Sequence, residues 1–89
     1  MRTIVEEQGY KEQIQALRVK WKRLDEALGE VATAICQIPD LFPQVPNSGD
    51  PGLRRLKLVG YEGVPPLSIF FSYTATEVRL HLAEIIDQE

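Results

Sequence analysis

The fold of this chain is decided by the stretch LSIFFSYTATEVRLHLAEII, residues 67–86. It holds two runs rich in β-branched, aromatic and leucine residues, at 67–73 and 77–86, joined by the short connection TAT. This is the pattern of two antiparallel strands linked by a tight turn. Residues 53–59 form a further such run, separated from residue 67 by two glycines and two prolines. The second half of the chain therefore predicts a three-stranded antiparallel meander.

The first half predicts helix. Its apolar residues recur at alternating three- and four-residue steps, a helical seam that continues up to Pro39. These residues are Ile14, Leu17, Trp21, Leu24, Leu28, Val31, Ile35 and Ile38. A continuous helix over residues 10–38 would be roughly 43 Å long, at ~1.5 Å per residue, and would overhang so small a domain.

Two alternatives follow for this seam. In the first, the overhanging helix exposes an apolar stripe that forms a homodimer interface through Ile14, Leu17, Trp21 and Leu24. In the second, the helix breaks into a hairpin and buries the stripe internally. Residues 2–6 are also open to two interpretations, a capping box that starts the helix early or a short edge strand, and we favour the helix.

The predicted fold class is therefore α+β, in a single domain over residues 1–89. A long N-terminal helix, or a helical hairpin if the helix breaks, packs on one face of the small antiparallel meander. The proline-rich segment 39–51 forms a loop between the two halves.

Composition excludes several classes of function. Ten Lys and Arg against thirteen Asp and Glu give a net charge of −3, whereas nucleic-acid-binding domains usually carry a basic footprint. One cysteine cannot close an internal disulfide, and one histidine offers no metal cluster, so we expect no metal and no cofactor. Because no apolar run approaches the ~20 residues that span a bilayer, we expect a soluble, cytoplasmic protein that does not bind a membrane.

Alternation along the strands assigns side chains to two faces. We expect one face, with Leu56, Phe71, Leu80 and Leu82, to cover the helix. The opposite, open face would carry Arg55, Lys57, Ser68, Phe70, Ser72, Arg79, His81, Ala83 and Ile85. Its cations and aromatic ring fit RNA phosphates and a stacked base, or an acidic protein partner. The same pattern is also typical of a solvated sheet face.

Four segments carry a resemblance to a known family. They are AICQIPDLFP at 34–43, GLRRLKL at 52–58, SIFFSY at 68–73 and EVRLHL at 77–82. In this order they resemble the RelE/ParE toxin superfamily of bacterial type II toxin–antitoxin systems. The resemblance implies a small antiparallel sheet packed on helices. It also implies ribosome-dependent mRNA cleavage or inhibition of DNA gyrase, either of them silenced by an antitoxin that wraps the toxin.

The chain departs from the family pattern in ways that bear on activity. Arg55 matches the arginine of the family's L-R-R motif. Two features differ from the mRNA-cleaving branch: Leu67 and Ser68 stand where that branch has an arginine, and the C-terminus is acidic. The sequence therefore predicts a divergent member that acts by binding proteins and lacks competent ribonuclease activity.

Two alternatives stay open. One is a non-toxic homodimeric interaction module that uses the helix seam. The other is a metal-independent endoribonuclease with a rearranged site, for which the candidate catalytic residues are Arg55, Lys57, Arg79 and His81. The expected partners are an antitoxin, and either the ribosome with its mRNA or gyrase.

Overall fold

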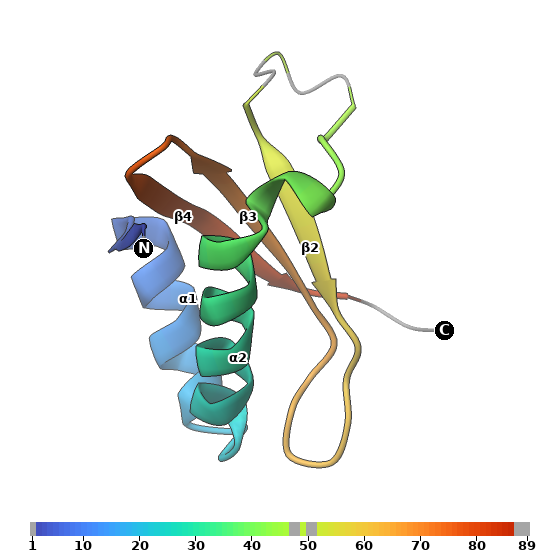
Figure 1. Cartoon of the computed structure of the whole chain (residues 1–89). Coiled ribbons are helices and arrows are strands. Elements are labelled where there is room, and N and C mark those ends of the chain that lie inside the picture. Colours follow the sequence, from blue (N-terminus) through green and yellow to red (C-terminus); the bar gives the residue numbers. More distant parts are fainter. Residues whose placement is uncertain (1, 47–48, 50–51, 87–89) are drawn as a thin grey trace.

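Within residues 2–46, 49 and 52–86, which the computed structural model describes, four strands form one mixed sheet in the order β1-β4-β3-β2 (Figure 1). The strands are β1 (Thr3–Glu6), β2 (Arg54–Leu58), β3 (Leu67–Tyr73) and β4 (Glu77–Ile85). Strands β2, β3 and β4 run antiparallel in sequence order, which confirms the predicted meander. The two helices α1 and α2 cover one face of this sheet (Figure 1), so the α+β class is also confirmed.

The first strand corrects the preference for helix at the N-terminus. Residues Thr3–Glu6 pair in parallel with the first half of β4, with Ile4 opposite Val78. Local sequence permits both conformations here. The strand forms because β4 has a free edge whose backbone groups these residues satisfy.

A continuous helix over residues 10–38 is wrong, and the helical hairpin forms in its place. Helix α1 (Gln8–Arg18) ends where the backbone N–H groups of Lys20 and Trp21 both donate to the Leu17 carbonyl. After a turn, α2 (Leu24–Gln37) runs back along the sheet and ends shortly before Pro39, as the proline predicts. The short 3₁₀ helix η1 (Pro39–Leu41) follows. Folding back lets both helices place their apolar stripes on the sheet, which one straight helix cannot do.

The hairpin changes the position of the predicted dimer seam. Ile14 and Leu24 are only 2% and 0% exposed and lie in the core of the chain itself. Leu17 and Trp21 are partly buried and pack against the same core. The stripe expected to remain exposed is thus largely covered within one chain.

A β-bulge in β4 changes which side chains face the helices. Phe71 lies opposite Leu80 while its neighbour Phe70 lies opposite Leu82, so His81 is an extra residue without a direct partner on β3. Beyond the bulge, Leu82 shares the open face with Phe70, whereas Ala83 is 2% exposed in the core. The predicted faces of Leu82, Ala83 and Ile85 were therefore wrong, because strict alternation assumes an unbroken strand.

The described residues include no helix that is both long and apolar enough to cross a bilayer. The predicted loop segment 39–51 begins with η1, and β2 starts only at Arg54. Residues 47–48 and 50–51 of that segment are outside the described residues.

Candidate functional site on the open face of the sheet

The four predicted catalytic residues lie on the sheet face that the helices leave open, but they form two separate groups. Arg55 and Lys57 come from the edge strand β2. Arg79 and His81 come from β4, two strands away, with β3 between them. Sequence alternation placed all four on the correct face, and their division into two groups follows from the order of the strands.

The first group lies on β2. The Arg55 guanidinium donates from Nε and Nη2 to Ser68 Oγ, at 3.0 and 2.7 Å, and its carbon lies 5.8 Å from the centre of the Phe70 ring. Lys57 is exposed. Both basic side chains also border a hollow of about 460 Å³, whose other wall is formed by Phe42, Pro43, Gln44, Val45 and Pro46. A cationic rim beside apolar walls suits a protein segment better than a bare phosphate.

The second group is centred on His81 at the bulge. His81 Nε2 lies 2.8 Å from Ser72 Oγ, and Nδ1 lies 2.5 Å from Glu7 Oε1. Because an ionised carboxylate can only accept, Glu7 holds the proton of the neutral ring on Nδ1 and leaves Nε2 to accept from the serine hydroxyl. Glu7 lies just after β1. Sequence analysis missed it because the preferred N-terminal helix gave it no neighbour on β4.

Electrostatics bind this second group together. The hydrogen bond from His81 is the main cause that lowers the pKa of Glu7. Burial acts in the opposite direction, and the nearby positive charge of Arg79 adds to the lowering. Arg79 Nη2 donates to Glu77 Oε1 at 2.8 Å, and Arg79 Nη1 lies 3.6 Å from Glu7 Oε2. The hydrogen bond to Glu77 raises the pKa of Arg79. Arg79 therefore already has carboxylate partners within the chain.

An apolar pair separates the two groups. Phe70 and Leu82 lie opposite each other on β3 and β4, and both side chains are partly buried. Glu84, opposite Ser68, adds a third carboxylate to the same face. In the described part of the sheet, the open face thus has an apolar centre with a mixed charged rim.

This arrangement limits what the site can do chemically. The Ser72–His81–Glu7 chain is a hydroxyl, an imidazole and an orienting carboxylate within hydrogen-bonding reach, which is the minimum for acid–base chemistry. Phosphoryl chemistry also needs cations aimed at one point, and here they are spread over the face or paired. No group of three His, Cys, Asp or Glu residues suited to a metal ion occurs among the described residues.

Comparison with known proteins adds no family to this description. No protein-family model matches the chain, and no curated protein matches it either.

Proposed function

We propose that this chain is a RelE/ParE-like toxin-family protein of a bacterial toxin–antitoxin system, and that it acts by binding a protein rather than by cleaving RNA. The order of sequence motifs that resembles that family is one support. The observation that carries the protein-binding mode is the apolar pair Phe70–Leu82 at the centre of a charged open face.

A face of this kind has the anatomy of a protein interface. Such interfaces place apolar and aromatic side chains at their centre and polar groups at the rim. Arg55 and Lys57 supply positive charge on one side, and on the other side Arg79 is already paired with Glu7 and Glu77. A phosphate backbone would have to compete with those carboxylates, whereas a protein surface with mixed charge would complement them.

The proposal is tested by inducing the protein tightly in a bacterial host, following growth, and mapping ribosome-associated mRNA ends in parallel. The purified protein is added to a gyrase supercoiling assay. We expect growth arrest without new mRNA ends, because the cations do not converge on a phosphate. Phe70→Ser, at the centre of the face, should relieve the arrest.

Val19→Ser is the matched control, since Val19 is an apolar residue 86% exposed just after α1, on the helical side of the sheet; it should arrest growth like the wild type. Lys57→Glu is a second variant for the case in which Phe70→Ser folds poorly. Normal growth with soluble wild-type protein would contradict the toxin assignment and favour a non-toxic interaction module.

A ribonuclease remains the second candidate, favoured by the contact of His81 with both Ser72 and Glu7. It predicts new mRNA ends on induction. Those ends should disappear in His81→Ala and in Arg55→Ala and decrease in Glu7→Gln. This outcome would overturn the protein-binding mode.

A further inference from the structure

The outer edge of β4 is only half covered. Strand β1 pairs with residues 77–80 of β4, and among the described residues no strand pairs with this edge beyond Leu80. Along the remaining part, Ile86 N–H donates inward to the Pro66 carbonyl. In an antiparallel pair, the backbone N–H and C=O groups of successive residues point alternately towards the partner strand and away from it. Because those of Ile86 point towards β3, those of Ile85 and of Ala83 point outward.

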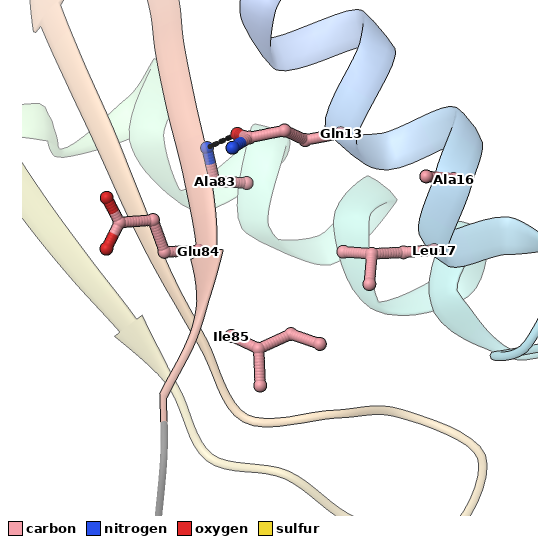
Figure 2. Close-up of a pocket in the computed structure, with 6 residues that line it drawn as sticks. All are labelled: Gln13, Ala16, Leu17, Ala83, Glu84 and Ile85. Atoms are coloured by element: carbon pink, nitrogen blue, oxygen red, sulfur yellow. Dashed lines mark hydrogen bonds between the residues drawn. The ribbon is translucent and has the colours of Figure 1, made fainter.

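A side chain from α1 occupies part of this edge. Gln13 Oε1 accepts from Ala83 N–H at 2.9 Å, as the dashed line in Figure 2 marks. This contact satisfies one backbone group and leaves the Ala83 carbonyl and the Ile85 N–H directed away from β3. An edge of this kind is a template for a further strand.

An apolar hollow lies directly beside the open edge. Its volume is about 390 Å³, and Gln13, Ala16, Leu17, Ala83, Glu84 and Ile85 line it. Figure 2 shows the Leu17 and Ile85 side chains on the hollow side of β4, while the Glu84 carboxylate points to the other side of the strand. Ile85 is 50% exposed, so an apolar side chain entering the hollow would cover it.

Self-association does not suit this edge. The antiparallel register that pairs both Ala83 and Ile85 with a second copy places Glu84 directly opposite its own copy. Like charges directly opposite each other destabilise a strand pair. An added strand complements this edge if it places a positive side chain opposite Glu84 and, on either side of it, an apolar residue that points towards the hollow. The chain's net charge of −3 also favours a positively charged partner.

We propose that the outer edge of β4 at Ala83–Ile85 binds an extended segment of a partner protein with the pattern apolar–basic–apolar, by strand addition. The partner's backbone bonds to Ala83 and Ile85, its basic residue pairs with Glu84, and an apolar residue enters the hollow beside Leu17. Only Glu84 is shared with the open face, whereas the backbone groups and the hollow lie at the outer edge of β4, so this site does not depend on the proposed function.

The test uses two capped peptides, Thr-Val-Lys-Val-Thr and Thr-Val-Glu-Val-Thr, titrated into the isotope-labelled protein. We expect the lysine peptide to shift the backbone amide of Ile85, the side-chain amide of Gln13 and the methyl groups of Leu17. It should bind more tightly than the glutamate peptide by up to about fivefold, since an opposite-charge cross-strand pair contributes up to about 1 kcal/mol. N-methylation of the lysine peptide's backbone should abolish binding.

Charge reversal provides the matched variants. Glu84→Lys should reverse the preference between the two peptides, and Glu62→Lys, the same charge change at an exposed turn residue, should leave it unaltered. Ile85→Pro removes an outward N–H without breaking the backbone hydrogen bonds between β4 and β3, and it should weaken the binding of both peptides.

Three results would overturn the proposal. The first is an absence of shifts at Ile85, and the second is an equal affinity for both peptides in the wild type and in Glu84→Lys. The third is a concentration-dependent dimer in sedimentation whose Ile85 amide is protected without peptide, which would assign the edge to a second copy.

Discussion

Deletion of His81 is expected to preserve the fold, whereas deletion of Arg79 two residues earlier is expected to damage it. His81 is the extra residue of the bulge. Without it, Leu80 and Leu82 become neighbours in a regular strand, and every other side chain of β4 keeps its face. Without Arg79, either Leu80 or Val78 must leave the core face, because the alternation shifts by one residue.

The structure gives the size of both effects. Deleting His81 removes its hydrogen bonds to Ser72 and Glu7, each worth roughly 0.5–1.5 kcal/mol, so the loss is about 1–3 kcal/mol. Deleting Arg79 exposes Leu80, now 4% exposed, at about 1.5–3 kcal/mol. It also places the imidazole in the core, which costs about 1–3 kcal/mol more. The total of about 2.5–6 kcal/mol reaches the lower end of the whole stability of a small domain, roughly 5–15 kcal/mol.

Urea unfolding followed by circular dichroism measures the free energy of unfolding of both deletions and the wild type. Nuclear Overhauser contacts between Leu82 and Phe70 check that the strands keep their pairing. If the His81 deletion loses as much stability as the Arg79 deletion, or loses the Leu82–Phe70 contact, the reasoning from the bulge is refuted.

Four further predictions concern stability. The pKa of Glu7 is held below its ordinary value of 4.5, so the stabilisation from its charge is present above that pH and is lost as pH falls; acid unfolding curves should be shallower for Glu7→Gln. Burial and the charge of Glu6 raise the pKa of Tyr10 from 10.0 to about 12. Stability should therefore fall as pH rises above 10, and Tyr10→Phe should remove that dependence in alkaline melts. Gly63 has a φ of 83° and no room beside Arg23 for a Cβ, so Gly63→Ala should cost about 1–2 kcal/mol in urea unfolding. Gly29→Ala, in α2 with open space around it, should gain about 0.5–1 kcal/mol.

The local signals were sufficient for the elements of the second half. Strand β3 has the predicted bounds, Leu67–Tyr73. Strand β2 is one residue shorter than predicted at each end, and β4 is one residue shorter at its C-terminal end. These strands were predictable because their β-branched and aromatic runs are separated by turn residues. The end of α2 was predictable for an equally local reason, since Pro39 excludes helical geometry before it.

The candidate site was predictable only in part. Alternation assigned Arg55, Lys57, Arg79 and His81 to one face. The bulge shifts the alternation only after His81, whose ring contacts Ser72 on that face, so the assignment was correct. Glu7 was missed, although it contacts both His81 and Arg79. It lies 74 residues before His81 in the chain, and no local pattern links the two.

Beyond residue 10, the sequence by itself determined which segments are helical and which are strands, the polarity of the strand faces up to the bulge and the helix end marked by Pro39. These depend on backbone and side-chain preferences within a few residues. Tertiary structure decided the break between α1 and α2, the strand at Thr3–Glu6 and the bulge at His81. Each of these was locally undetermined, and the conformation that formed satisfies backbone groups or buries apolar surface against residues distant in the chain.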